Sequence, residues 1–178
     1  MRVLAGRYKS KLIRTINDPL TRPMMSKVRE SIFNSLQFNI DNKDILDLYA
    51  GSGSLGIESL SRGANFVTFI ENSDDCITIL KNNLNEFENN YKITKSSVDK
   101  FLQTSLSTYD IVFYDPPFKI ETDVVKNEVM KIYNILNTDG FVVIHRHTAS
   151  KELDTLKNYK IHKEKNYGQS NILILRKL

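Results

Sequence analysis

The chain has 178 residues, which suits one domain with a complete hydrophobic core. Its 40% hydrophobic residues, 26% charged residues and formal net charge of +4 are typical of a globular protein. The single cysteine, Cys76, excludes an internal disulfide and a cluster of cysteines around a metal.

No apolar run is long enough to cross a bilayer, and the first residues lack the apolar core of a signal peptide. We therefore expect a cytoplasmic protein without a membrane partner. The mildly positive charge is compatible with a polyanionic partner but does not imply one.

Residues 1–40 differ from the rest of the chain. The first 22 residues carry many basic side chains and a single acid, Asp18. Loosely alternating apolar residues around Gly6 predict a small hairpin, and apolar residues at every fourth position from Met24 to Leu36 predict a helix. We expect this basic extension to pack on the domain that residues 41–178 form.

Several basic side chains of this extension are candidates for contacts with nucleic-acid phosphates. They are Arg7, Lys9, Lys11, Arg22 and Arg29. For any single lysine, a solvated charged surface is the favoured alternative.

From residue 44 onward, short apolar runs alternate with helical segments. The predicted strands cover residues 45–49, 66–70, 91–94, 109–114, 141–145, 159–164 and 171–176. The predicted helices cover residues 55–60, 74–87, 98–102, 122–136 and 151–156, with a turn at 137–140. Repeated β-α units predict a doubly wound α/β fold with a mostly parallel, seven-stranded, Rossmann-like sheet. The last two strands, with no helix between them, predict an antiparallel hairpin at the sheet edge.

A glycine-rich turn follows the first of these strands. Asp47 to Gly56 contains the pattern G-x-G-x-x-G, in which Gly51, Ser52 and Gly53 form the turn. Glycines let a ligand approach the backbone closely, and Glu71, at the end of the next strand, can accept both ribose hydroxyls. The pattern fits a dinucleotide or S-adenosylmethionine.

Asp47 favours S-adenosylmethionine, because a carboxylate beside the turn repels a pyrophosphate and attracts the cationic sulfonium and ammonium groups. After the third strand, Asp99 can accept from the adenine amine while the Val98 backbone meets the ring edge. Taken singly, these acids are equally well explained as capping, turn or solvated loop residues. Their occurrence at successive strand ends favours a cofactor site.

The segment Asp115-Pro116-Pro117-Phe118 ends the apolar run Tyr109–Tyr114, where ligands of open α/β sheets bind. Prolines lack an N–H group, so the segment presents acceptors beside an aromatic ring. It is suited to a planar group that carries an NH2, such as a nucleobase. We expect Asp115 and the Pro116 carbonyl to hold the amine in line with a methyl donor, and Phe118 to stack on the base. The alternative is that the prolines only end a strand.

His145, Arg146 and His147 end the fifth strand. No second pair of ligands accompanies them in the sequence, so we expect no metal site and assign them to the mouth of the site.

These motifs resemble those of class I amino-methyltransferases with a D-P-P-[YF] motif, and more narrowly the bacterial RsmD-type guanine-N2 methyltransferases of small-subunit ribosomal RNA. The resemblance also includes Val28–Asn34, Ala50–Gly53 and Ser61–Ala64. It implies S-adenosylmethionine as donor, and as acceptor a guanine of 16S ribosomal RNA, within a small subunit or its assembly intermediate. A monomer is expected. The chain departs from the family pattern at Ser10 and at Met24-Met25-Ser26-Lys27.

Other functions remain open at this point. DNA adenine-N6 methyltransferases share the motif but usually carry a separate target-recognition region. Protein-glutamine methyltransferases typically have Asn in place of Asp115. A non-catalytic RNA-binding assembly factor would not need the acids, and a nicotinamide dehydrogenase is disfavoured by Asp47.

Overall fold

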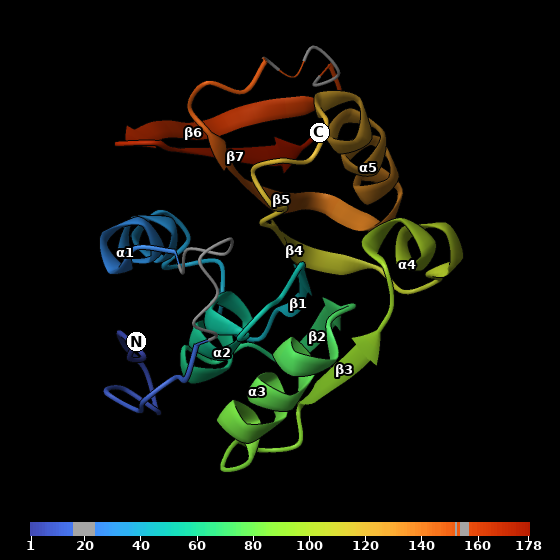
Figure 1. Ribbon diagram of the computed structural model, residues 1–178. Helices are drawn as coiled ribbons and strands as arrows, with labels where there is room; N and C mark the ends of the chain where they lie inside the picture. The colour runs from blue at the N-terminus through green and yellow to red at the C-terminus, as the bar shows by residue number, and fades with distance from the viewer. Residues whose placement is uncertain (16–23, 152, 154–156) are drawn as a thin grey trace.

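The computed structural model of the chain describes residues 1–15, 24–151, 153 and 157–178. Within this part, a seven-stranded sheet has the order β3-β2-β1-β4-β5-β7-β6 (Figure 1). The strands are β1 (Asp44–Leu48), β2 (Phe66–Glu71), β3 (Tyr91–Lys95), β4 (Tyr109–Tyr114), β5 (Leu136–His147), β6 (Tyr159–Tyr167) and β7 (Ser170–Lys177). The helices are α1 (Ser26–Ser35), α2 (Ser54–Ser61), α3 (Asp74–Leu84), α4 (Val98–Thr104) and α5 (Thr122–Ile135).

The strand directions confirm the predicted fold class. Strands β1 to β5 pair in parallel, whereas β7 pairs antiparallel with both β5 and β6. The closing hairpin therefore forms one edge of a doubly wound sheet, as the absence of a helix between its strands predicted.

Both faces of the sheet are covered by helices (Figure 1). Helices α1, α2 and α3 pack on the face that receives Ile111 and Phe113 of β4. Helices α4 and α5 pack on the face that receives Val112 and Tyr114. Because successive side chains of a strand point to opposite faces, a continuous apolar run in the sequence fills two separate cores.

Serine side chains start the helices that follow β2 and β3. The hydroxyl of Ser73 accepts from the Cys76 N–H at 3.4 Å, and that of Ser97 accepts from the Lys100 N–H at 3.4 Å. Such caps satisfy backbone donors that a helix leaves free at its first turn. They fix both helix starts directly after strand ends, where ligands bind in this class of fold.

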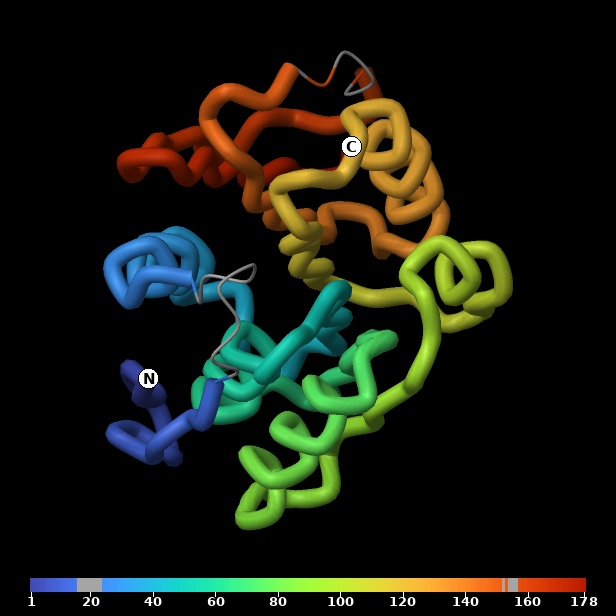
Figure 2. The backbone as a smooth tube through the Cα atoms, viewed as in Figure 1, coloured from blue at the N-terminus to red at the C-terminus, as the bar shows by residue number. Residues whose placement is uncertain are grey.

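The N-terminal extension is held by a buried acid of α2. Glu58 is fully buried, and its carboxylate accepts from the Leu4 N–H at 2.8 Å and from the Ala5 N–H at 3.1 Å. It also pairs with Arg62 at 2.8 Å. Figure 2 shows the extension beside α2. The predicted hairpin is present as a single antiparallel bridge between Arg2 and Leu12 rather than as two strands.

In the C-terminal half, β5 and β6 are longer than the sequence predicted, and the largest difference is at the start of β5. The predicted turn at residues 137–140 lies inside β5, where Asp139 has a φ of 64° and the pairing with β4 shifts register. The turn residues therefore bend the strand without ending it. Most of the predicted helix at 151–156 lies outside the described residues.

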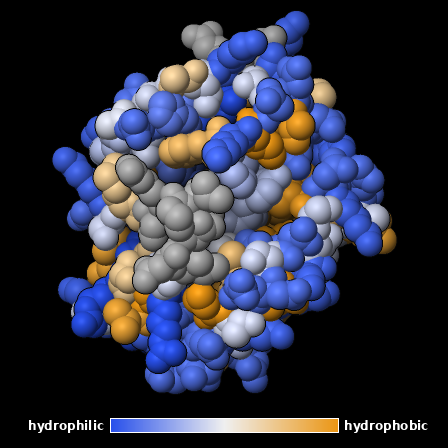
Figure 3. Space-filling model, in the orientation of Figure 1, coloured by the Kyte–Doolittle hydropathy of each residue, from blue (hydrophilic) through white to orange (hydrophobic). Residues whose placement is uncertain are grey.

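No helix among the described residues has the length and apolarity needed to cross a bilayer. The face seen in Figure 3 is mostly hydrophilic, with apolar surface in small patches between polar side chains.

Replacing the anchoring acid tests how the extension is held. Glu58→Ala is expected to lower the free energy of unfolding by about 3 kcal/mol, because it leaves two backbone donors and the half-buried Arg62 unpaired. Glu58→Gln keeps one acceptor oxygen and should lose less. Urea unfolding measures both variants, and equal stability of Glu58→Ala and the wild type would contradict the anchoring role.

Candidate active site

The two central strands diverge at the point where the candidate residues gather. In the parallel pair of β1 and β4, Asp47 lies opposite Phe113 and Leu48 lies opposite Tyr114. The chain continues from β1 toward β2 on one side, and from β4 toward β5 on the other. Ligands of open α/β sheets bind in the crevice that such a reversal of strand order creates. Asp115 directly follows β4 at this crevice.

The glycine turn leaves β1 through left-handed backbone conformations. Tyr49, Gly51 and Gly53 have φ values of 58°, 55° and 81°. A side chain at Gly53 would also collide with Leu80 of α3. Glycine is thus required at position 53 by both conformation and space. The Gly51 N–H donates to Glu71 at 2.8 Å, which ties the turn to the end of β2.

Asp47 lies buried below this turn. Its side chain is 2% exposed, and its Oδ2 accepts from the Gly56 N–H at 2.9 Å. Burial raises the pKa of Asp47 well above its usual value, and the nearby carboxylates of Asp115 and Glu71 raise this pKa further. The site therefore combines three acids, a charge distribution that favours a cationic ligand.

Glu71 is held in a fixed orientation. Besides the Gly51 N–H, its carboxylate accepts from the backbone N–H groups of Asn72 at 2.7 Å and Ser73 at 2.9 Å. Each carboxylate oxygen has further lone pairs for a ligand hydroxyl. The backbone thus positions an acceptor at the end of β2.

A cavity of about 230 Å³ lies beside Glu71. It is lined by Tyr49, Ile70, Glu71, Asn72, Ser96, Ser97, Val98, Asp99 and Glu128. Glu71, Val98 and Asp99, which were predicted from separate strand ends, therefore lie in one cavity. Its combination of apolar and acidic walls suits a flat ring with hydroxyl and amine substituents.

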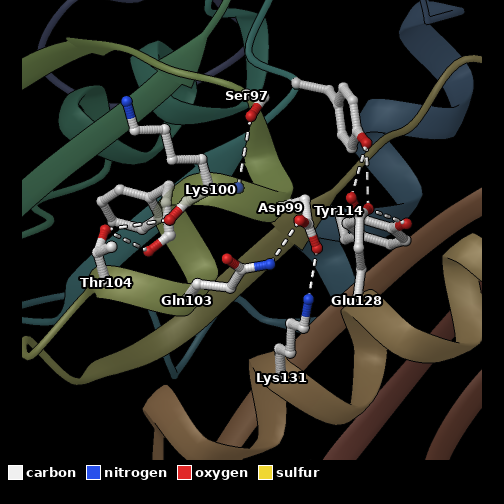
Figure 4. A network of polar contacts seen from close by, with 10 residues as sticks. Ser97, Asp99, Lys100, Gln103, Thr104, Tyr114, Glu128 and Lys131 are labelled. Atoms are coloured by element: carbon white, nitrogen blue, oxygen red, sulfur yellow. Dashed lines mark hydrogen bonds and ion pairs between the residues drawn. The ribbon is translucent and has the colours of Figure 1, made fainter.

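Figure 4 shows a network of polar contacts around Asp99 and Glu128, two acids that line this cavity. Asp99 forms an ion pair with Lys131 and accepts from the Gln103 side chain at 2.6 Å. Glu128 accepts from the hydroxyl groups of Tyr49 at 3.1 Å and Tyr114 at 2.6 Å. Burial raises the pKa of Glu128.

Glu128 was missed by the sequence analysis, although a signal was present. It occupies a position on the apolar side of α5, between Val125 and Val129. An acid at a core position of a helix is uncommon unless its oxygens are paired inside the protein.

The segment after β4, Asp115–Phe118, lies beside the histidines at the end of β5. The Oδ1 atom of Asp115 lies 2.7 Å from Nδ1 of His145, and the Pro117 carbonyl accepts from the Ile120 N–H at 2.9 Å. Among the described residues, the Pro116 carbonyl has no hydrogen-bond partner. Phe118 is 45% exposed and makes edge-to-face contacts with His145 and His147. The carboxylate, a free carbonyl and an exposed ring are thus adjacent.

The residues predicted to contact phosphates differ in their surroundings. Arg7 and Lys11 form ion pairs with Glu88 at 2.5 Å and with Glu86 at 2.6 Å, and Lys9 is exposed. Arg22 lies outside the described residues.

The prediction for Arg29 does not fit the structure. Arg29 is fully buried, and its guanidinium donates to the Arg2 carbonyl and to Sδ of Met1. Burial lowers the pKa of this group. Helical periodicity predicted one apolar side of α1. It could not show that the N-terminal segment covers the side that carries Arg29. The guanidinium is therefore not available to a phosphate.

The strand-end cluster at residues 145–147 is likewise more enclosed than expected. His145 and Arg146 are buried, and Arg146 donates to the Lys151 carbonyl at 2.8 Å and to Oγ1 of Thr122 at 3.0 Å. Arg146 therefore fastens the start of α5 to the end of β5.

Comparisons with known proteins agree with the motif-based resemblance. A family model described as "Conserved hypothetical protein 95" matches residues 1–176. The chain is 30% identical to the putative rRNA methyltransferase YlbH of Bacillus subtilis, over 99% of both chains. It is 33% identical to the ribosomal RNA small subunit methyltransferase D of Haemophilus influenzae, over 94% of this chain and 89% of that protein. The solved structure of a putative methyltransferase, yhhF, from Escherichia coli matches with a TM-score of 0.87 at 27% identity, covering 99% of this chain and 97% of that one.

The buried acid of β1 gives a prediction for stability. Asp47→Asn is expected to raise the free energy of unfolding by about 1–2 kcal/mol at pH 8, because it removes a buried charge and keeps the acceptor for the Gly56 N–H. In the wild type the folded pKa is raised, so stability falls as pH rises from the unfolded pKa of about 4 through the folded value. The gain should therefore be smaller at pH 5 than at pH 8.

Urea unfolding at the two pH values measures this difference. Asp123→Asn, at an exposed acid in the first turn of α5, is the control and should keep the pH dependence of the wild type. A variant at position 47 that is less stable than the wild type at pH 8 would contradict the prediction.

Proposed function

We propose that this chain, which belongs to the family described as Conserved hypothetical protein 95, transfers a methyl group from S-adenosylmethionine to the N2 amine of a guanine in small-subunit ribosomal RNA. Ribosomal RNA methylation is the activity that the names of its relatives carry. The observation that supports the chemistry best is the grouping of Asp47, Glu71 and Asp115 around one crevice of the sheet.

The described residues fit S-adenosylmethionine. This co-substrate supplies a methyl group on a cationic sulfur, which the acids beside the glycine turn stabilise. Gly51, Ser52 and Gly53 let it approach the backbone, and Glu71 accepts from the ribose hydroxyls. Val98 and Asp99 receive the adenine ring and its amine in the cavity beside β3.

Asp115 and the Pro116 carbonyl are assigned to the acceptor amine. An aromatic amine is a poor nucleophile because its lone pair is delocalised into the ring. Two acceptors that hold both N–H bonds direct this lone pair toward the methyl carbon, so orientation supplies much of the rate. Asp115 also stabilises the positive charge that develops on nitrogen and accepts the proton that nitrogen loses. Pro117 shapes the segment, and Phe118 stacks on the base.

The RNA is proposed to meet the basic N-terminal extension, through Arg7, Lys9, Lys11 and Arg22. The first three belong to the segment that Glu58 of α2 anchors. Helix α2 begins directly after the glycine turn, so it links this segment to the proposed cofactor site. Phosphate contacts of this kind give no base specificity, but they orient the substrate. A small ribosomal subunit or an assembly intermediate is the proposed form of the RNA.

A transfer assay tests the proposal directly. The protein is incubated with methyl-labelled S-adenosylmethionine and, separately, with small ribosomal subunits, free 16S ribosomal RNA and DNA, all prepared from cells that lack this protein. Nucleoside digests should contain labelled N2-methylguanosine from a ribosomal sample. Label in N6-methyladenine of DNA would replace the ribosomal substrate with DNA, and the absence of label from every sample would contradict enzymatic activity.

The proposed role of the carboxylate after β4 gives a second prediction. Asp115→Ala should lower kcat by about 100-fold or more, because it removes an acceptor that acts in the transition state. The Kd for S-adenosylmethionine, measured by calorimetry, should change little. Asp123→Ala is the control at an exposed acid, and a wild-type kcat in Asp115→Ala would contradict the role.

A further inference from the structure

His145 connects the proposed catalytic carboxylate, Asp115, to a buried serine. Its Nδ1 lies 2.7 Å from Oδ1 of Asp115, and its Nε2 lies 2.9 Å from Oγ of Ser170. We propose that His145 is a positioning residue that fixes Asp115 for the acceptor amine, with Ser170 fixing the imidazole in turn. The inference rests on the proposed function and adds two residues to it.

The hydrogen-bonding capacities of the three groups are consistent with one arrangement. The carboxylate form of Asp115, which the proposed function requires, can only accept, so Nδ1 of His145 must donate to it. A neutral imidazole then has a lone pair on Nε2, which accepts from the Ser170 hydroxyl. The carboxylate thus sets the tautomer, and the serine hydroxyl, which can donate or accept, holds the ring by donating to Nε2.

The proposed positioning residue is more buried than the carboxylate that would contact the amine. The side chain of His145 is 8% exposed and that of Asp115 is 30% exposed. The imidazole therefore lies behind the carboxylate, where it holds Oδ1 and leaves Oδ2 for the amine. The ring of Phe118 also contacts His145, with centroids 5.1 Å apart, so one imidazole supports both the acid and the proposed stacking ring.

Strand pairing makes this arrangement rigid. Tyr114 of β4 lies opposite Ile144 of β5, so Asp115 and His145 follow at the same level of the parallel pair. Ser170 begins the antiparallel β7, where it lies opposite His147. Sites built on strands hold side chains more closely than sites built on loops.

The connectivity of serine, imidazole and carboxylate is that of a hydrolytic triad, but the exposure is reversed. In such a triad the serine meets the substrate and the carboxylate is buried. Here Ser170 is 9% exposed and lies on the closed side of His145, whereas Asp115 borders the crevice. The same three groups therefore present an oriented carboxylate rather than a nucleophilic hydroxyl.

Two conservative substitutions at one position separate positioning from packing. His145→Asn keeps an N–H donor near the place of Nδ1, whereas His145→Gln places its amide near Nε2. We expect kcat in His145→Asn within about threefold of the wild type, and kcat in His145→Gln and His145→Ala about 10- to 100-fold lower, since small displacements of an orienting group cost that much. Ser170→Ala should fall between them.

The measurements are kcat and KM for the RNA substrate, Kd for S-adenosylmethionine, and thermal unfolding. The positioning role predicts that kcat falls while KM and Kd stay near wild-type values. His162→Ala, at the exposed histidine of β6 that packs on Phe141, is the matched control and should keep the wild-type kcat. If His145→Ala does not fold, the pair His145→Asn and His145→Gln decides.

Equal kcat values for His145→Asn and His145→Gln in an active enzyme would overturn the positioning role and leave the proposed function intact. A wild-type protein that methylates no RNA would overturn the proposed function and the positioning role with it.

Discussion

The grouping of carboxylates at the divergence of β1 and β4 is the constraint on which the site depends. Burial and the charges of Glu71 and Asp115 raise the pKa of Asp47, which means that the ionised site costs free energy in the folded protein. A cationic ligand removes part of this cost. The backbone N–H groups of Gly51, Asn72 and Ser73 orient Glu71, and that of Gly56 orients Asp47, so the surrounding chain maintains an arrangement that is unfavourable without a ligand.

The sequence predicted what depends on local pattern. Apolar runs and helical spacing defined the β-α units, and the glycine turn with Asp47, Glu71 and Asp115 located the crevice, because strand ends of a parallel sheet meet at one edge. The burial of Arg29 could not be predicted from the sequence, because it depends on the N-terminal segment lying across α1. The pairing of Asp115 with His145 depends on the register of β4 and β5, which hydrophobic periodicity does not specify.

The acids of the site differ in what neutralises them. Asp99 has Lys131 beside it, whereas Glu128 is hydrogen-bonded to two tyrosine hydroxyls and, within the described residues, to no cation. Asp47, in the crevice, has the Gly56 N–H as its hydrogen-bond partner and no cation within the described part of the chain. In the proposed function, the cationic end of the donor gains most beside such an uncompensated acid, and the aromatic end enters the cavity in which Lys131 compensates Asp99.

The extension and the cofactor turn are physically connected. Asn83 of α3 is buried; its amide nitrogen donates to the Ser52 carbonyl of the glycine turn at 3.0 Å and to the Arg14 carbonyl at 2.9 Å. Its oxygen accepts from the Arg14 N–H at 2.9 Å. Helix α2 makes a second connection, since it receives Asp47 at Gly56 and the extension at Glu58. A basic segment held in this way cannot shift far without disturbing the turn. The two proposed binding regions, for a polyanion and for a cationic donor, are therefore joined by hydrogen bonds through Asn83 and through α2.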